Sequence, residues 1–310
     1  MTMAAAAAAP GTARSERLAI QLMIAQAVLF SAETVAIHYL GSGVPVMQLA
    51  LVRGLGGLLL AVGLARHLGL AVLRTRQLAL QLLRGFVSLF YLWVMIFSFS
   101  RLPFADATAI SYTQAAYIVG FSVLILGEAV AWSRWAAAAI GIAGALLIAK
   151  PAFADWHSAY LVALLGTSLN GLAFVLNRYL QRQDSEATTL LYTNLVAALG
   201  SAPVLVTVGL PPPQVFSWLP CLLLFGPVGM YVGIVAVKHA PAAMLAPYTL
   251  LRLLIALVGG AVVFREAPDA LSAVGALLIV ASCALSRAAA PRFTGVVQPF
   301  RGIARRVVRG

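Results

Sequence analysis

The sequence predicts an all-α integral membrane fold, with ten transmembrane helices arranged as two inverted five-helix repeats around a central cavity. Three observations lead to this prediction. Only 10% of the 310 residues are charged and 62% are hydrophobic, whereas about 25% are charged in soluble domains. Apolar windows of about 19 residues, long enough to cross a ~30 Å hydrocarbon core, recur along the chain. Short motifs of the first half return in the second half.

The apolar windows follow one another with mostly short connections, which leaves no room for a soluble domain. They lie near residues 18–40, 45–66, 77–99, 104–126, 132–150, 157–180, 187–208, 216–237, 241–264 and 269–287. Residues 1–17 lack the basic region and leucine-rich core of a cleaved signal, so we interpret them as a flexible N-terminal tail. The two repeats then comprise residues 18–150 and 151–288, and a basic C-terminal tail, 289–310, follows.

Most of the 21 Lys and Arg residues lie at one set of window ends. The opposite ends carry Arg101, Lys150 and Arg265, and the windows themselves contain Arg53, Arg84 and Arg252. An excess of Lys and Arg marks the cytoplasmic side of membrane proteins, so we expect both termini in the cytoplasm. The net charge of +12 then reflects orientation in a lipid bilayer, and we expect no nucleic-acid partner.

One motif of the repeat joins a proline at the start of a window to a glutamate just after it. The stretch from RLPFADATAISY to LILGE holds Pro103 and Glu128, which are 25 residues apart. The stretch from HAPAAMLAPY to VVFRE holds Pro241 and Glu266 at the same spacing. Both glutamates are expected at helix ends just outside the hydrocarbon, as interfacial anchors or end-of-helix pairs. Their symmetric placement also allows a role in gating, with the prolines as bending points.

Two further matches support the same register. LFSAETVAIHYL in the first window aligns with LNGLAFVLNRYL in the sixth, and IGIAGALLI in the fifth matches VGALLIV in the tenth. Chance similarity among Ala- and Leu-rich helices is the alternative. Because five is odd, the second repeat crosses the membrane in the opposite sense. Inverted repeats of this kind recur in secondary transporters, whose substrate site lies near the midplane at the repeat interface.

With two five-helix halves, a proline at the start of each fourth helix, a glutamate just after it and a Gly-rich fifth helix, the sequence resembles the EamA branch of the drug/metabolite transporter superfamily. Within that branch it looks most similar to the YddG-type bacterial exporters of aromatic and other neutral amino acids. The resemblance implies an exporter in the bacterial inner membrane, with a central cavity shared by the two halves.

Glu33 and Arg53 are charged residues at similar depths on consecutive windows. At ~1.5 Å of rise per residue, they lie roughly 10 Å and 12 Å from the outer ends. A charged side chain at a helix centre costs roughly 2.5 to 3.5 kcal/mol unless it finds a partner or water. One interpretation is therefore an ion pair. In the other, Glu33 faces the cavity and binds a substrate ammonium group or takes up a proton, because the matching face of the sixth window carries Asn170 and Asn177. Proton coupling stays open.

Arg252 and Gln114 occupy matching positions in the ninth and fourth windows, each eleven residues after the proline at its start. Both positions are near the midplane. A guanidinium group can bind a carboxylate in two places, which suits the head group of an amino acid. Tyr248 and Ser111 extend the two faces toward the window starts. A structural pairing of Arg252 with Glu33 or with backbone carbonyls is the alternative.

The third window contains a stripe of aromatic residues, Phe86, Phe90, Trp93 and Phe97. Such a stripe could line a binding wall for apolar or aromatic substrates, and Trp93 is its candidate for the substrate path. Helix packing or lipid contact is the alternative. Tyr91 and Ser88 point elsewhere, and Tyr112 is a weaker candidate for the substrate path.

Several functions are disfavoured by what the sequence lacks. It has no P-loop, zinc-ligand spacing or nucleophile elbow, so we expect no ATP use, no metal, no cofactor and no enzymatic activity. An intramembrane lipid-modifying enzyme would need clustered acidic or His residues, and Glu33 is the only acidic residue deep in any window. A channel would need a carbonyl filter or a charged ring. We therefore expect a secondary exporter of amino acids or similar metabolites that works by alternating access, with another metabolite or drug class as the alternative.

Overall fold

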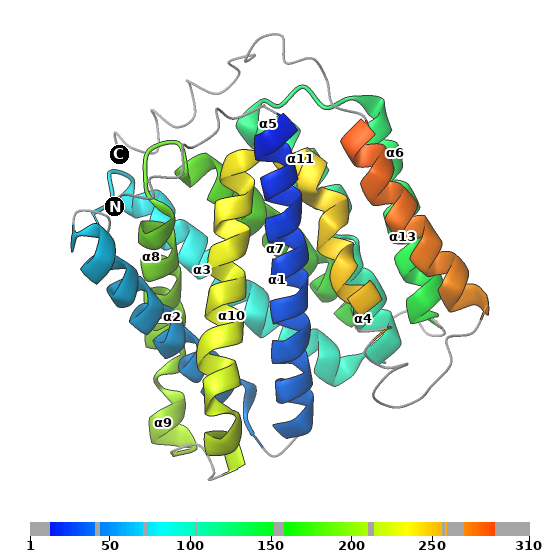
Figure 1. The fold of residues 1–310 in the computed structure, drawn as a ribbon. Helices are drawn as coiled ribbons and strands as arrows, with labels where there is room; N and C mark the ends of the chain where they lie inside the picture. The colour runs from blue at the N-terminus through cyan, green and yellow to red at the C-terminus, as the bar shows by residue number, and fades with distance from the viewer. Residues whose placement is uncertain are drawn as a thin grey trace.

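The chain is helical along most of the length that the computed structural model describes, which is residues 13–40, 44–70, 74–102, 104–151, 158–209, 214–255, 258 and 270–288. The helices of the first half are α1 (Ala13–Leu40), α2 (Val46–Leu68), α3 (Leu78–Arg101), α4 (Phe104–Tyr112), α5 (Gln114–Leu126) and α6 (Trp132–Ala149). Those of the second half are α7 (Ser158–Leu180), α8 (Glu186–Ser201), α9 (Val204–Thr207), α10 (Gln214–His239), α11 (Ala242–Leu245), the 3₁₀ helix η3 (Ala246–Leu250) and α13 (Ala270–Ala288) (Figure 1).

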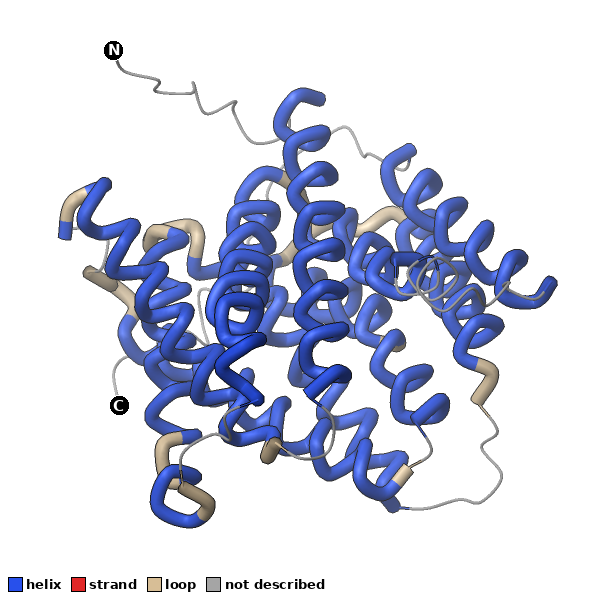
Figure 2. Tube along the Cα trace, turned by 60° about the horizontal axis from the view of Figure 1, so that its bottom comes forward, coloured by secondary structure: helices blue, strands red, loops and turns tan. Residues whose placement is uncertain are grey.

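The predicted all-α class is confirmed, since the described residues contain no strand (Figure 2). Every predicted window overlaps at least one helix. One boundary differs from the prediction: α1 begins at Ala13, so residues 13–17, predicted as part of the tail, are helical. A polar first turn that carries an acidic residue, Glu16, is favourable at a helix start and extends the helix beyond its apolar part.

The helices have the length and surface of membrane spans. Seven of the described helical stretches are long and apolar enough to cross a membrane, and Leu78–Val94 and Ala242–Ile255 are shorter apolar helices. Large apolar side chains such as Leu59, Leu124 and Leu277 are 66%, 60% and 70% exposed. Water would disfavour so many exposed side chains of this kind, whereas lipid tails accept them.

The two halves pack on each other in a reciprocal way. α1 lies along α10, as Figure 1 shows at the centre of the molecule, and α3 lies along α7. α2 packs with α8, and α6 with α13. In the register of the repeat, α1 corresponds to α7 and α3 to α10, so the first two contacts are copies of one arrangement. When two helices are in contact and their repeat counterparts are in contact as well, the two halves are related by two-fold symmetry.

Two glycines matched by the repeat touch each other. Gly144 of α6 and Gly275 of α13 hold the same place in the motifs IGIAGALLI and VGALLIV. A Cβ at Gly144 would lie 2.6 Å from the Gly275 carbonyl oxygen, and a Cβ at Gly275 would lie 2.5 Å from the Gly144 carbonyl oxygen. Only glycine permits this approach of two helix backbones. Counterparts that contact each other lie on the symmetry axis, which supports the repeat register.

The fourth helix of each half is interrupted partway along. Between α4 and α5 a turn occurs at Thr113, whose backbone N–H bonds the Ile110 carbonyl at 3.0 Å. In the second half, α11 passes into the 3₁₀ helix η3, where Pro247 lacks a backbone donor. Discontinuous helices of this kind frame the substrate sites of many secondary transporters.

Basic side chains gather where α7 and α10 end and where α3, α8 and α11 begin. Arg178 donates to carbonyls at the end of α10, and Lys238 pairs with Glu186 at the start of α8 at 2.6 Å. Asp184, just before α8, accepts a hydrogen bond from the Arg76 backbone N–H just before α3. We call this end of the molecule, drawn at the top of Figure 1 where α11 begins, the basic end.

Candidate functional site

Glu33 and Arg53 form an ion pair where α1, α2 and α10 meet. Arg53 Nε lies 3.1 Å from Glu33 Oε1, and the side chains are 38% and 6% exposed respectively. A Cβ at Gly226 of α10 would lie only 2.0 Å from Glu33 Oε1 and 2.7 Å from Arg53 Nε. The ion pair that similar depths predict is therefore present, and it rests directly on the backbone of α10.

The polar face of α1 continues along a row of glycines on α10. A Cβ at Gly229 would lie 3.0 Å from the Phe30 ring, and a Cβ at Gly233 would lie 1.9 Å from Gln26 Nε2. Gly229 follows Gly226 by three residues, and Gly233 follows Gly229 by four, so the three glycines share one face of the helix. The glycine row makes room for the large side chains of α1, so this face packs against another helix over much of its length.

Glu33→Gln is expected to lower the thermal stability of the protein more than the transport rate per folded molecule. The substitution leaves the Arg53 guanidinium without an opposite charge, and a partly buried group that loses its partner costs on the order of 1–3 kcal/mol. The unfolding midpoint of purified protein measures this cost, and the double variant Glu33→Gln/Arg53→Gln should recover part of it. An unchanged midpoint with lost transport would instead give Glu33 a role in substrate or proton binding.

Phe30 lies between two guanidinium groups. Its ring centroid is 5.3 Å from the guanidinium carbon of Arg53 and 5.8 Å from that of Arg252. Arg252 belongs to the second half, and its carbonyl oxygen accepts a hydrogen bond from Ser31 Oγ at 3.4 Å. Each cation–π contact contributes about 0.5–1 kcal/mol when exposed and more when desolvated. Two cations, one from each half of the chain, thus converge on one aromatic ring.

Two tyrosines belong to the same region. Tyr91 on α3 and Tyr112 at the end of α4 both lie within electrostatic range of Arg252, and Tyr91 also lies within range of Arg53. Both tyrosines are half-buried. Aromatic rings beside guanidinium groups offer contacts for an apolar side chain and for a carboxylate in one place. We call Phe30, Arg53, Tyr91, Tyr112 and Arg252 the arginine–aromatic site.

The aromatic stripe of α3 does not face this site. Phe86, Phe90, Trp93 and Phe97 are 59%, 49%, 42% and 43% exposed. Tyr91 lies on another side of the helix, together with Val87 and Val94, which are buried. Trp93 therefore lies on a different face of α3 from Tyr91, and its place in the substrate path stays a prediction.

Tyr248 packs away from the arginine–aromatic site. It is 5% exposed, and its hydroxyl donates to the Cys283 carbonyl at 3.2 Å within an apolar cluster of α1, α10 and α13. The prediction placed Tyr248 and Arg252 on one face because residues four apart share a face of an α-helix. Tyr248 lies in η3, and a 3₁₀ helix has three residues per turn, so that rule fails here. The place of Tyr248 in the substrate path stays a prediction.

Gln114 and Asn170 form a hydrogen bond between the two halves. Asn170 Nδ2 on α7 donates to Gln114 Oε1 at the start of α5 at 2.7 Å. Both residues are half-buried, as is Ser111 near the end of α4. The sequence singles out each of these three residues, and the structure adds the contact between the two amides, next to the interruption of the fourth helix.

Asn177 has a partner that sequence reasoning missed. Its Oδ1 accepts a hydrogen bond from Arg84 Nε on α3 at 2.8 Å. The signal was available, because Arg84 is an arginine inside an apolar window that contains no acidic residue. The structure therefore adds Arg84 to the candidate residues. It also shows that Asn177 and Asn170 have different partners, Arg84 and Gln114.

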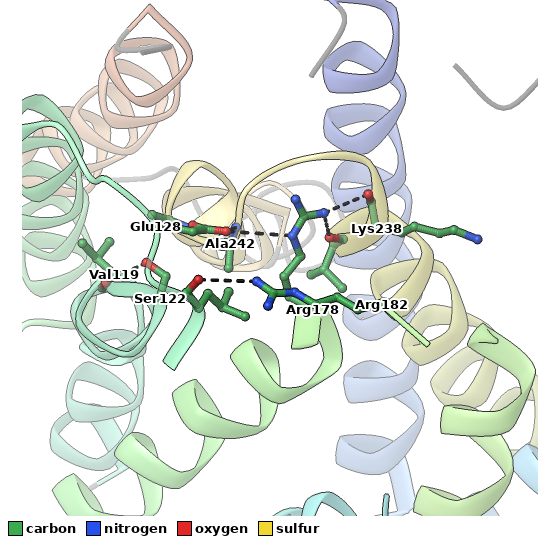
Figure 3. Close-up of polar contacts among 10 residues, drawn as sticks. Val119, Ser122, Glu128, Arg178, Arg182, Lys238 and Ala242 are labelled. Carbon is green, nitrogen blue, oxygen red and sulfur yellow. Dashed lines mark hydrogen bonds and ion pairs between the residues drawn. The ribbon is translucent and has the colours of Figure 1, made fainter. Parts of the chain in front are cut away.

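At the basic end, Glu128 joins the two halves (Figure 3). Its carboxylate oxygens accept hydrogen bonds from the backbone N–H groups of Ala242 and Ala243 at 3.3 and 3.4 Å. Arg178 Nε on α7 lies 3.9 Å from Glu128 Oε1 and so completes the cluster. A carboxylate at a helix start is stabilised by free N–H groups and by the helix dipole. Glu128 therefore makes the predicted end-of-helix interaction, just after Pro241.

Glu128→Gln is expected to change the pH dependence of stability. Burial raises the pKa of Glu128 above its ordinary value of 4.5, while Arg178 and the two backbone N–H groups oppose the shift. A carboxyl group whose pKa is raised by folding stabilises the protein at low pH, and this contribution is lost as the pH rises through the folded-state pKa. The unfolding midpoint of the wild type relative to Glu128→Gln should therefore fall as the pH rises above about 4.5. A relative midpoint that rises with pH would contradict this.

Three predicted residues of the repeated proline–glutamate motif remain, Pro103, Pro241 and Glu266. Pro241 precedes α11 with an extended backbone, φ −58° and ψ 141°. Pro103 and Glu266 lie outside the described residues. Within the described part of the chain, no group of three or more His, Cys, Asp and Glu side chains is placed to hold a metal ion.

Comparison with known proteins relates the chain to membrane transporters. The family described as "EamA-like transporter family" matches twice, over residues 17–150 and 157–288. An S-adenosylmethionine uptake transporter of Rickettsia bellii is 25% identical over 81% of this chain and 86% of its own. The pseudopaline exporter CntI of Pseudomonas aeruginosa is 27% identical over 86% and 95% of the two chains. A riboflavin transporter of Brucella anthropi is 28% identical over 83% and 94%.

The fold has also been seen in a crystal structure. A solved protein chain superposes with a TM-score of 0.75 at 22% sequence identity, over 89% of this chain and 99% of its own. This likeness shows the fold of the chain.

Proposed function

Because the chain belongs to the EamA-like transporter family, we propose that it is a secondary transporter that exports amino acids, aromatic and other neutral ones, or similar small metabolites by alternating access. In this proposal the ten windows all cross the bacterial inner membrane, as two inverted repeats of residues 18–150 and 151–288 around a central cavity. Both termini and the basic end face the cytoplasm. The reciprocal packing of the halves and the excess of Lys and Arg at one end support this arrangement.

The observation that carries the proposal is the convergence of Arg53 and Arg252 on Phe30. Glu33 pairs with Arg53, so three charged groups leave this region net positive. A positive site beside aromatic rings suits the carboxylate and the side chain of an aromatic or neutral amino acid. The two arginines come from different halves, so a movement of one half against the other changes the site, as alternating access requires.

The relatives support a small-molecule substrate and leave its class to experiment. They are named for S-adenosylmethionine, pseudopaline and riboflavin, and their names describe both uptake and export. S-adenosylmethionine carries the head group of an amino acid, in keeping with a site for a carboxylate. The alternative is therefore an exporter of another metabolite or drug class that uses the same site.

Entry from the cytoplasm would pass the basic end. Glu128, Arg178 and the start of α11 join the two halves there, so we expect this cluster to separate when the site opens toward the cytoplasm. Glu128 and Pro241 would then act in gating. Energy for net export would come from the substrate gradient or from protons, and Glu33 is the candidate proton carrier if protons are coupled.

Counterflow in liposomes tests the proposed function. Purified protein is reconstituted with an unlabelled amino acid inside, and uptake of labelled phenylalanine, leucine, a sugar and a quaternary amine is measured with and without a pH gradient. We expect uptake of the amino acids alone. Uptake of only the sugar or the amine would contradict the proposed substrate class, and acceleration by the gradient would assign the coupling ion.

A further inference from the structure

Arg84 is a buried cation whose partners are neutral. It lies on α3, in the part of the helix nearest the basic end, and is 5% exposed. Nε donates to Asn177 Oδ1 on α7 at 2.8 Å, and Nη1 donates to Thr193 Oγ1 on α8 at 2.5 Å. Among the described residues no carboxylate contacts this guanidinium, and Nη2 makes no hydrogen bond. The positive charge is therefore held by neutral dipoles.

A purely structural role does not explain this charge well. A guanidinium inside a membrane span is costly, and such residues usually mark a functional site. Two neutral hydrogen bonds satisfy two of its five N–H donors and leave the charge uncompensated. A glutamine could join the same helices through hydrogen bonds without this cost. The charge itself therefore needs an explanation, and an anion that binds during the transport cycle supplies one.

The symmetry of the fold places this residue at a repeated junction. Arg84 lies where α3, α7 and α8 meet, and these helices are the repeat counterparts of α10, α1 and α2, which meet at Arg53. At the first junction Glu33 neutralises the arginine. At the second junction Asn177 and Thr193 take the place of a carboxylate. The same three-helix junction thus occurs twice, once with a neutralised arginine and once with a positively charged one.

The two junctions lie at different depths. Glu33 and Arg53 are in the parts of α1 and α2 away from the basic end, whereas Arg84 is toward it. An anion that leaves the Arg84 junction away from the basic end would therefore move toward the positive charge of the arginine–aromatic site.

We propose that Arg84, Asn177 and Thr193 form a second, carboxylate-binding site, which receives the carboxylate of the exported molecule before it reaches Arg252. The binding of a carboxylate stands on the uncompensated guanidinium alone. Only the statement that the carboxylate belongs to the exported molecule rests on the proposed function. Asn177 and Thr193 are positioning residues, because they hold two nitrogens of the guanidinium and leave Nη2 for the anion.

The test uses acetate as a carboxylate probe on the purified full-length chain. The unfolding midpoint of the wild type and of Arg84→Gln is measured across a series of sodium acetate concentrations, with sodium chloride at equal ionic strength as the comparison. Ligand binding to the folded state raises the midpoint with the logarithm of ligand concentration above Kd. We expect acetate to stabilise the wild type more than chloride does, and, in an Arg252→Gln background that removes the other carboxylate contact, Arg84→Gln to weaken acetate binding at least tenfold.

The same experiment separates binding from a structural role. Without acetate, Arg84→Gln should unfold at the wild-type temperature or above it, because glutamine is uncharged. Arg84→Lys keeps the charge but loses the fork, so it should fold and bind acetate more weakly than the wild type. Arg252→Gln serves as the matched control, since the Arg84-dependent effect of acetate should persist there.

Four results would overturn the proposal. Acetate could stabilise Arg84→Gln as much as the wild type, or chloride could match acetate, which would indicate a halide site. Arg84→Lys could bind acetate as tightly as the wild type, or both Arg84 variants could fail to fold, which would make Arg84 a structural bridge. Failed amino-acid counterflow with acetate binding intact would instead contradict only the proposed function, and the carboxylate site would stand.

Discussion

Gly226→Leu is expected to leave little or no folded protein. A Cβ at this position would lie 2.0 Å from Glu33 Oε1 and 2.7 Å from Arg53 Nε, far inside any contact that real atoms make. The added side chain must therefore push α1 from α10 or break the ion pair. Overpacking of this kind costs typically 1–3 kcal/mol and more where the backbone cannot move, and the uncompensated charges add to it. The yield of monodisperse protein after detergent extraction measures the effect.

Gly63→Leu is the matched control for this substitution. Gly63 is also a helix-interior glycine, on α2, and a Cβ there would meet nothing within 4 Å. Both variants gain the same helix propensity and the same apolar surface, so their difference isolates the packing at Gly226. A normal yield of Gly226→Leu would contradict the packing of Glu33 and Arg53 on α10.

Arg252→Gln is expected to reduce amino-acid transport by about 10- to 100-fold without loss of folded protein. A hydrogen bond to a charged group contributes about 1.5–3 kcal/mol, and each 1.4 kcal/mol is about tenfold in affinity. Arg252 is exposed in the protein and so contributes little to packing. The loss should appear as a higher half-saturating substrate concentration in counterflow, because the carboxylate loses its partner.

Arg101→Gln is the control for Arg252→Gln. The Arg101 guanidinium carbon lies 5.6 Å from the Phe97 ring centroid, so it makes the same type of contact on the exposed side of α3. Its removal should leave counterflow unchanged. Equal effects of the two substitutions, or none at Arg252, would remove Arg252 from the substrate path.

The sequence predicts the helices and the repeat well because the bilayer imposes both length and apolar composition on every span. The ion pair between Glu33 and Arg53 follows from depth alone, since two opposite charges at one level of adjacent helices lower each other's cost. The contact between Gly144 and Gly275 likewise agrees with the register that short motifs predict.

Side-chain direction could not be predicted in the same way. Lipid-facing and buried positions of a span are equally apolar, so the aromatic stripe of α3 does not reveal that Trp93 is exposed while Tyr91, on another face, is half-buried. The contact of Tyr248 with Cys283 could not be predicted, because the 3₁₀ helix that contains Pro247 changes which residues share a face. Arg84 is recognisable as an arginine in an apolar window, but its partners Asn177 and Thr193 depend on which helices meet, and no local pattern contains that.

The most direct test of the arginine–aromatic site is competition between two molecules that differ by one carboxylate. In proteoliposomes that show counterflow of labelled phenylalanine, unlabelled L-phenylalanine and phenethylamine are added at equal concentrations. Phenethylamine keeps the ring and the amine but has no carboxylate. The account predicts that phenylalanine inhibits uptake and that phenethylamine does not. Equal inhibition by both would contradict a site that recognises the carboxylate through Arg252.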